Sequence, residues 1–203
     1  GSEMCIRDSA HIVIDAKTGR TLHSLNARTR NYPASLTKIM TLYMTFDALS
    51  DGTISLGQKL PVSRISQGRS PSKLGLRRGE RISVNDAIKA LVVKSANDAA
   101  TVLAEALGGT ERKFAIMMTR RARALGMKNT IFKNASGLPH RRQLSTAEDM
   151  AILARSMLYQ HRKMYHYFSR PEFRGSLFFD PRNARIHGFR PETIEKPDIR
   201  VLC

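Results

Sequence analysis

The amino-acid sequence predicts an α+β fold in which a helical lobe packs on an antiparallel sheet. Three observations carry this prediction: two short β-rich segments near the start of the chain, a run of amphipathic helical segments after them, and turn or cap residues between these elements. Strands followed by a run of helices favour α+β over an alternating, parallel arrangement. With 203 residues, of which 41% are hydrophobic, the chain is long enough to bury the core of one domain.

The two β-rich segments predict a hairpin. Residues 10–15 are rich in β-branched side chains, and residues 21–25 alternate between apolar and polar side chains. Residues 17–20 between them have turn composition, and Gly19 supplies the positive φ that such a turn needs. The hairpin is therefore expected to start the sheet.

A buried helix is predicted directly after the hairpin. Pro33 leads into residues 36–49, whose apolar side chains form a wide stripe. Gly52 follows the last of them and ends the helix with good turn chemistry. The next residues, 53–81, are rich in glycine, serine and proline and predict a loop with short strands.

Further helices are predicted in the second half of the chain, each opened or closed by a recognisable residue. They are residues 84–93 after the cap Ser83, residues 98–107, a segment from the cap Thr110 to about residue 125, and a segment to about residue 159. The run Ser-Thr-Ala-Glu at 145–148 has the spacing of a capping box and is expected to open the last helix with Ser145 as N-cap.

A serine and a lysine stand three residues apart at the start of the first predicted helix. Ser35 and Lys38 lie within the string PASLTKIMT, and positions i and i+3 share one face of a helix. A partly desolvated lysine has a lowered pKa and can take the proton of a serine hydroxyl. The alternative is that Ser35 only caps the helix. A lysine in the first turn of a buried helix favours the catalytic interpretation.

A second polar group follows sixty residues after the first. Ser95 and Asn97 offer a hydroxyl and an amide, which suit proton relay and substrate orientation. The alternative is that both residues only cap the helix that begins at Asp98. Their occurrence beside Ser35 and Lys38 favours the functional interpretation.

At these positions the sequence resembles the serine D-alanyl-D-alanine carboxypeptidases, which are low-molecular-mass penicillin-binding proteins of the β-lactamase/transpeptidase-like superfamily. The resemblance runs from about residue 10 to about residue 158, in the family's order. The strings that carry it are PASLTKIMT, LVVKSANDAATVLAE, GLP at 137–139 and LSTAEDMA at 144–151.

The resemblance implies a serine-type peptidase that removes the terminal D-alanine from peptidoglycan stem peptides ending in D-Ala-D-Ala. Ser35 would attack the carbonyl of the penultimate D-alanine, and Lys38 would take the serine proton. Ser95 would pass a proton to the departing D-alanine, while Asn97 would bind the substrate amide. The resemblance also implies acylation of Ser35 by β-lactam antibiotics, no metal or cofactor, and export to the periplasm or another site outside the cytoplasm.

The sequence departs from the family's pattern at its third motif. Lys-Thr-Gly occurs at 17–19, before Ser35, where it is expected to be only the turn of the hairpin, and it does not occur again after residue 159. The chain is therefore expected to be C-terminally incomplete, with a sheet that lacks its C-terminal strands, an unpaired edge on the hairpin and impaired activity. We expect residues 1–9 to be a junction segment, residues 10–160 a partial catalytic domain, and residues 161–203 a poorly matched hairpin and tail.

The chain is strongly basic, with a net charge of +17 from 34 Lys and Arg against 17 Asp and Glu. This charge predicts attraction to a polyanion, such as an anionic cell-wall polymer or a membrane surface. Nucleic acid is disfavoured, because aromatic residues make up only 6% of the chain, there is no tryptophan and no nucleic-acid motif is present. The basic run at 120–123 is expected to be the solvated face of a helix.

Two other functions remain open at this point. A β-lactamase would share the serine and lysine but needs a well-placed glutamate for fast deacylation, whereas Glu148 lies in the predicted capping box. A non-catalytic basic module for cell-wall polymer or nucleic acid would bind in a salt-sensitive way that does not depend on Ser35. His140 lies beside Arg141 and Arg142 before the capping box; it is not needed as a catalytic histidine and is expected on a solvated basic loop. The histidines and tyrosines at 161–167 are expected to be surface residues, because no carboxylate or thiol completes a metal-ligand pattern around them.

Overall fold

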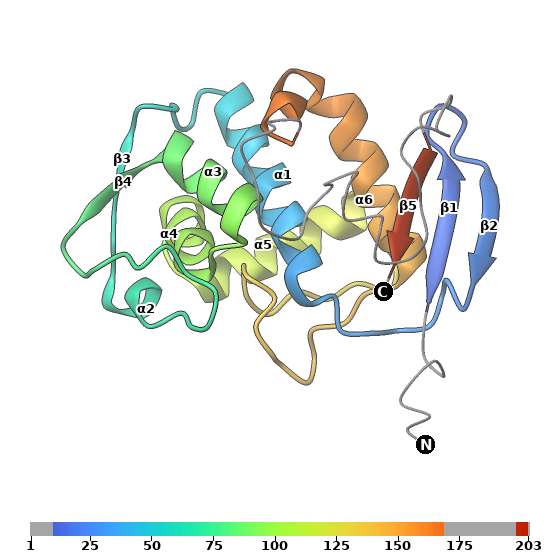
Figure 1. The fold of residues 1–203 in the computed structure, drawn as a ribbon, viewed down its shortest axis with the longest axis horizontal. Coiled ribbons are helices and arrows are strands. Elements are labelled where there is room, and N and C mark those ends of the chain that lie inside the picture. Colours follow the sequence, from blue (N-terminus) through green and yellow to red (C-terminus); the bar gives the residue numbers. More distant parts are fainter. Residues whose placement is uncertain (1–9, 169–197, 203) are drawn as a thin grey trace.

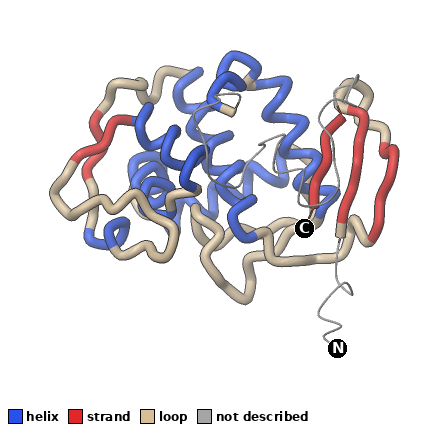
Figure 2. The backbone as a smooth tube through the Cα atoms, viewed as in Figure 1, coloured by secondary structure: helices blue, strands red, loops and turns tan. Residues whose placement is uncertain are grey.

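The structure is a computed structural model and describes residues 10–168 and 198–202. A lobe of helices occupies most of the molecule, and a small antiparallel sheet stands along one side of it (Figure 1). Figure 2 shows that helices dominate the described chain and that the strands form two separate groups at opposite ends. The predicted α+β fold, a helical lobe on an antiparallel sheet, is confirmed.

The larger sheet has three antiparallel strands in the order β2-β1-β5. The predicted hairpin is confirmed as β1 (His11–Asp15) and β2 (Thr21–Leu25), joined through a turn in which Gly19 has a φ of +77°. The third strand, β5 (Asp198–Leu202), pairs with the other edge of β1 along its whole length. The expectation that this edge would stay unpaired is therefore wrong, since the last residues of the chain close it.

The sheet is attached to the helical lobe through α6 (Ala147–Gln160), which packs against β1 and β5 (Figure 1). Side chains alternate along β1, so that Ile12 and Ile14 are buried while their neighbours are half-exposed. These two isoleucines belong to the same hydrophobic core as the helices. The core is therefore continuous from the sheet into the lobe.

Helix α1 (Thr37–Ser50) is the central element of the lobe and packs against α6 and against α3 (Val84–Lys94), α4 (Asn97–Gly108) and α5 (Glu111–Ala124). Its buried side chains surround the whole helix rather than one face, and they include Met40, Tyr43 and Phe46 without measurable exposure. A helix that is covered on every side holds its first turn firmly in place. The 3-10 turn η1 (Ala34–Leu36) precedes it and carries Ser35.

The helices α3 (Val84–Lys94), α4 (Asn97–Gly108) and α5 (Glu111–Ala124) follow the predicted ranges to within one or two residues. Both predicted caps are confirmed: the Ser83 hydroxyl accepts from the N–H of Asp86, and the Thr110 hydroxyl accepts from the N–H of Lys113. Local sequence chemistry was therefore sufficient to place these helix starts.

The predicted capping box at the start of α6 is wrong by one residue. The N-cap is Thr146, whose hydroxyl accepts from the N–H of Asp149. Ser145 instead pairs its hydroxyl with that of Thr130 at 2.8 Å, and Glu148 reaches out to Arg28. Ser145 and Thr146 are adjacent, and either hydroxyl could have capped the helix. Ser145 is bound to Thr130, so Thr146 is the cap.

The glycine-rich segment after α1 contains the predicted loop and short strands. β3 (Lys59–Pro61) and β4 (Arg81–Ser83) form a two-stranded ladder at the end of the lobe opposite the large sheet (Figure 1). A one-turn helix, α2 (Arg64–Gln67), was not predicted; the Ser63 hydroxyl caps it by accepting from two backbone N–H groups. Four residues are too few to give a periodic signal in the sequence.

The expected surface cluster after α6 lies partly in the core instead. In and beside the 3-10 turn η2 (Arg162–Tyr167), His161 is 6% exposed and Tyr167 is 3% exposed. The His161 ring meets the Tyr43 ring edge-on at 4.7 Å and lies 3.0 Å from a carboxylate oxygen of Asp47. Asp47 also pairs with Arg121 at 2.8 Å, so the basic run in α5 is not wholly a solvated face.

Two further findings concern the described part of the chain only. None of its helices combines the length and apolar composition that a membrane crossing requires. It contains no group of three or more histidine, cysteine or acidic residues that could hold a metal ion. Residues 1–9, expected to be a junction segment, and residues 169–197 of the expected hairpin and tail lie outside the described residues.

Candidate active site

Ser35 lies in a tight crossing of two backbone segments. It is half-buried in η1, directly after Ala34, which has the unusual φ of +45°. Gly137 comes so close that a Cβ atom built on it would lie 1.7 Å from the carbonyl oxygen of Ala34 and 3.0 Å from the amide nitrogen of Ser35. Only glycine fits there, and its φ of +89° is also in the left-handed region. The loop around Gly137 therefore holds the backbone on which Ser35 stands.

The alternative role of Ser35 as a helix cap is wrong. The N-cap of α1 is Leu36, and no side chain caps this helix. No hydrogen bond within the described part of the chain occupies the Ser35 hydroxyl. The half-buried serine is thus left available for chemistry.

Lys38 is buried in the first turn of α1, with 1% of its surface exposed. Its Nζ donates a hydrogen bond to the carbonyl oxygen of Ser136 at 2.5 Å, and no carboxylate among residues 10–168 forms an ion pair with it. Because burial removes water from the ammonium group, the pKa of Lys38 is lowered from 10.5 to about 8. With this pKa about a tenth of the lysine is neutral at pH 7 and about half at pH 8, so the neutral amine can act as a base.

The acceptor of Lys38 is held by a compact turn at 134–137. The Asn134 side-chain oxygen accepts from the N–H groups of Ser136 and Gly137, at 3.2 and 2.7 Å. One helical turn beyond Lys38, the Thr41 hydroxyl donates to the carbonyl of Ala135 at 2.7 Å. The same loop therefore fixes the lysine through Ser136 and the serine through Gly137.

Ser95 ends α3 in the left-handed conformation, with a φ of +52°. Its hydroxyl is buried and has no hydrogen-bond partner among the residues that the structure describes. The next helix, α4, has Ala96 as its N-cap and no side-chain cap, so the capping role considered for Ser95 and Asn97 is wrong. A strained backbone that buries an unpaired hydroxyl is a costly arrangement, and such arrangements gather at functional sites.

Asn97 is the first residue of α4 and is attached to the preceding long loop. Its side-chain amide donates to the carbonyl of Ser70 at 3.4 Å, and its backbone N–H donates to the carbonyl of Ser72 at 2.8 Å. The neighbouring Asp98 is fully buried and accepts hydrogen bonds from the N–H groups of three consecutive loop residues, 74–76, at 2.9 to 3.1 Å. The loop is thereby held against the turn that carries Ser95 and Asn97.

The structure thus forms two halves of the predicted site, each held by its own contacts. Ser35 and Lys38 share the 134–137 loop, and Ser95 and Asn97 share the turn before α4. Helix α1 packs directly against α3 and α4 (Figure 1), but no hydrogen bond among the described residues joins one half to the other. The catalytic roles of these four residues therefore remain predictions.

A pocket of about 440 Å³ opens beside Ser35. Residues 32–34, residues 137–141 and Gln143 line it with mainly apolar atoms, and Tyr32 among them is largely exposed. His140, which was expected on a solvated loop, is exposed and lines this pocket. The pocket provides an apolar surface next to the serine on which a substrate side chain could pack.

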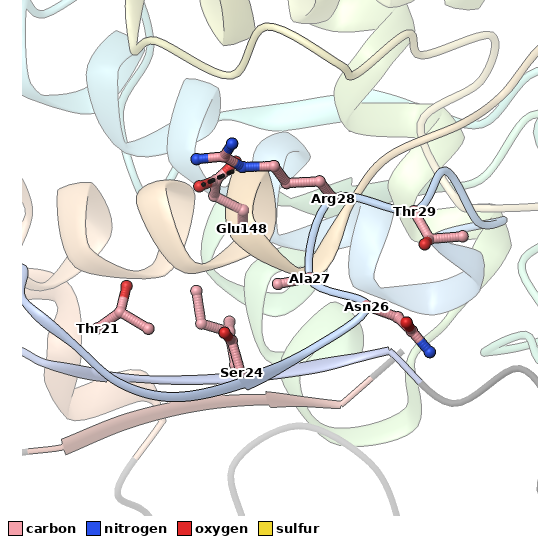
Figure 3. A pocket seen from close by; sticks show the side chains of 8 residues that line it. Thr21, Ser24, Asn26, Ala27, Arg28, Thr29 and Glu148 are labelled. Carbon is pink, nitrogen blue, oxygen red and sulfur yellow. Dashed lines mark hydrogen bonds and ion pairs between the residues drawn. The ribbon is translucent and has the colours of Figure 1, made fainter.

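A second pocket, of about 670 Å³, lies between the hairpin and the start of α6 (Figure 3). It is lined by Thr21, Ser24 and Arg28 among others, and Glu148 reaches into it to pair with Arg28 at 3.2 Å. Neither Ser35 nor any residue of its pocket contributes to this one. Glu148 is therefore paired with Arg28, in the segment that follows the hairpin, and not with the serine.

Three contributors to the site were missed in the sequence. The carbonyl of Ser136 accepts from Lys38 in α1, the carboxylate of Asp98 binds the loop at 74–76, and the carboxylate of Glu111 accepts from the backbone of Ala135. The string around Gly137 was recognised, but its contact with the backbone of Ser35 was not. Backbone acceptors leave no trace in a motif, since any residue type can supply them.

Comparisons with known proteins match most of the chain to one family. Residues 2–187 match the family peptidase S11, D-alanyl-D-alanine carboxypeptidase. The chain is 36% identical over 157 residues to the D-alanyl-D-alanine carboxypeptidase DacF of Bacillus subtilis, covering 77% of this chain and 40% of the relative. It is 33% identical over 183 residues to DacC of Escherichia coli, covering 87% of this chain and 46% of the relative.

Solved structures show the same likeness. The crystal structure of the carboxypeptidase DacD from Francisella tularensis matches with a TM-score of 0.78 and 36% identity, over 82% of this chain and 40% of that one. Penicillin-binding protein D2 from Listeria monocytogenes, in its ampicillin-bound form, matches with a TM-score of 0.72 and 31% identity, over 80% of this chain and 66% of that one. The chain spans less than half the length of the curated relatives named above.

Proposed function

Because this chain belongs to the peptidase S11 family of serine D-alanyl-D-alanine carboxypeptidases, we propose that it supplies the acylation machinery for cleaving the terminal D-alanine from peptidoglycan stem peptides. The observation that carries the proposal is the state of Lys38. This lysine is buried, has no carboxylate partner among the described residues and has a pKa lowered to about 8. It lies three positions after Ser35, whose side chain does not cap the helix. Few structural roles require a buried cation in this position.

In the proposed reaction, the Ser35 oxygen attacks the carbonyl carbon of the penultimate D-alanine while neutral Lys38 takes the hydroxyl proton. The peptide bond then breaks, and the terminal D-alanine leaves as an amine after receiving a proton through Ser95. The backbone N–H of Ser35 helps to stabilise the oxyanion, and Asn97 binds the amide of the stem peptide. Water hydrolyses the resulting ester and restores Ser35. A β-lactam acylates the same oxygen by opening its ring.

Deacylation separates this reaction from that of a β-lactamase. A fast β-lactamase needs a carboxylate that activates water at the ester, whereas Glu148 is paired with Arg28 in the pocket beside the hairpin. We therefore propose that a penicilloyl ester on Ser35 is long-lived. The reaction takes place outside the cytoplasm, where the net charge of +17 favours contact with anionic cell-wall or membrane surfaces.

The test is to measure two reactions of the purified chain in parallel: release of D-alanine from a peptide ending in D-Ala-D-Ala, and hydrolysis of benzylpenicillin. We expect D-alanine release, stoichiometric binding of penicillin and only slow penicillin hydrolysis, with Glu148→Gln leaving all three unchanged. Penicillin hydrolysis that outpaces D-alanine release, and that Glu148→Gln slows, would establish a β-lactamase instead. Salt-sensitive binding of polyanions with no reaction at Ser35 would establish a non-catalytic module.

A further inference from the structure

Glu111 is a buried carboxylate that none of the proposed catalytic steps uses. It is the first residue of α5, directly after the cap Thr110, and only 7% of its surface is exposed. A buried carboxylate is stable only when its oxygens are well satisfied. The groups that satisfy this one come from three different segments of the chain.

One oxygen of Glu111 faces the loop that binds Lys38. Its Oε1 accepts from the backbone N–H of Ala135 at 3.1 Å. Ala135 directly precedes Ser136, whose carbonyl accepts the hydrogen bond from Lys38. A movement of the Glu111 carboxylate therefore moves the Ser136 carbonyl, which accepts from Lys38, because only one residue separates the two contacts.

The other oxygen faces the loop that binds Asn97. Its Oε2 forms an ion pair with the guanidinium group of Arg69. Arg69 directly precedes Ser70, whose carbonyl accepts from the Asn97 side chain. The arginine is only partly exposed, so this ion pair is less screened than a surface pair.

The third contact connects the same carboxylate to α4. The Thr101 hydroxyl, which is fully buried, donates to Glu111 Oε1 at 3.3 Å. Thr101 lies four residues after Asn97 and therefore on the same face of the helix. The carboxylate thus contacts the helix that begins with Asn97, the loop before it and the loop next to Lys38.

From this arrangement we infer that Glu111 is a positioning residue that sets the two halves of the active site relative to each other. The inference rests on the proposed function, because it assigns Lys38 and Asn97 to one reaction. Glu111 does not touch the substrate. Its carboxylate binds the 134–137 loop through one oxygen and the 69–72 loop through the other. It thereby fixes the position of Lys38 relative to Asn97.

The first test measures this coupling without using activity. Hydrogen exchange followed by mass spectrometry is compared for the parent, Glu111→Ala, Glu111→Gln and the control Glu148→Ala, which breaks another Glu–Arg pair in the first turn of a helix. We expect Glu111→Ala to speed exchange in both loops at once, Glu111→Gln to do so less, and Glu148→Ala to do so in neither. Faster exchange in only one loop, or in none, would overturn the inference.

The second test measures the consequence for acylation by a fluorescent penicillin. We expect Glu111→Ala to lower the limiting acylation rate constant about tenfold or more, and to raise the pH midpoint of acylation as water reaches Lys38. Glu111→Gln keeps an oxygen that can accept from Ala135 and should recover part of the rate. A folded Glu111→Ala protein with the parent's rate constant and pH midpoint shows a purely structural role and overturns the inference. Absence of any Ser35 adduct on the parent instead contradicts the proposed function, and the exchange data then decide the inference alone.

Discussion

Replacement of Lys38 by methionine is expected to stop acylation of Ser35 and, at the same time, to stabilise the fold. Without the base, the rate constant of acylation should fall by about 10²–10⁴. The fold should gain stability because the buried lysine, whose pKa is lowered from 10.5 to about 8, is costly to keep charged. The shift in pKa means that burying the charged lysine costs the folded parent about 3 kcal/mol at pH 7. Methionine avoids this cost but loses the hydrogen bond to Ser136, which removes about 1 kcal/mol of the gain. The net expectation is a gain of about 2 kcal/mol in the free energy of unfolding.

The pH dependence of this gain follows from linkage. Between pH 8 and 10.5 the unfolded chain holds a proton on Lys38 that the folded protein has released, so the stability of the parent rises with pH in that window. The advantage of Lys38→Met in urea unfolding should therefore be full below pH 8 and shrink above it. In the same window the acylation rate constant of the parent should rise with a midpoint near pH 8. An advantage of Lys38→Met that does not change with pH, or an equal gain in the exposed control Lys128→Met, would contradict this interpretation.

Replacement of Asp98 by asparagine is expected to destabilise the protein by about 3 kcal/mol. The carboxylate is fully buried and accepts from the N–H groups of Leu74, Gly75 and Leu76, and also from that of Ala99. An asparagine side chain of the same size would turn an NH₂ group toward some of these donors. Released from Asp98, the loop would lose its position beside Asn97, so acylation should fall as well.

Urea unfolding and limited proteolysis of the 70–76 loop measure this effect. The matched control is Asp86→Asn, since Asp86 also lies near the start of a helix but is largely exposed and bonds to the Ser83 hydroxyl. The control should change stability by about 1 kcal/mol or less. If Asp98→Asn has the same urea midpoint of unfolding as the parent, and the protease cuts its 70–76 loop no faster, Asp98 does not organise this loop.

The sequence predicted those parts of the fold that depend on neighbours along the chain. The turn around Gly19 and the caps Ser83 and Thr110 involve contacts within a few residues, and all three are confirmed. The start of α6 was misplaced because Ser145 bonds to Thr130, fifteen residues away, and leaves the cap to Thr146. Pairing of β5 with β1 connects the two ends of the chain and has no local signal.

The same division holds for the candidate site. The side chains proposed to act on substrate lie in short sequence strings that can be recognised. The groups that hold these side chains in position do not lie in such strings. Lys38 is bound by a backbone carbonyl 98 residues away, and Glu111 reaches Arg69 across 42 residues. Such contacts depend on the packing of α1, α4 and α5 and appear only when the chain is folded.

The most direct test of the central claim, that Ser35 and Lys38 form a working acylation site, is intact-mass spectrometry after incubation with benzylpenicillin. The parent, Ser35→Ala and Lys38→Met should be compared at the same concentration and pH. We expect one adduct with the mass of intact penicillin on the parent, none on Ser35→Ala, and one formed only very slowly on Lys38→Met. A parent that stays unmodified, or an adduct that persists in Ser35→Ala, would show that the two residues do not form this site.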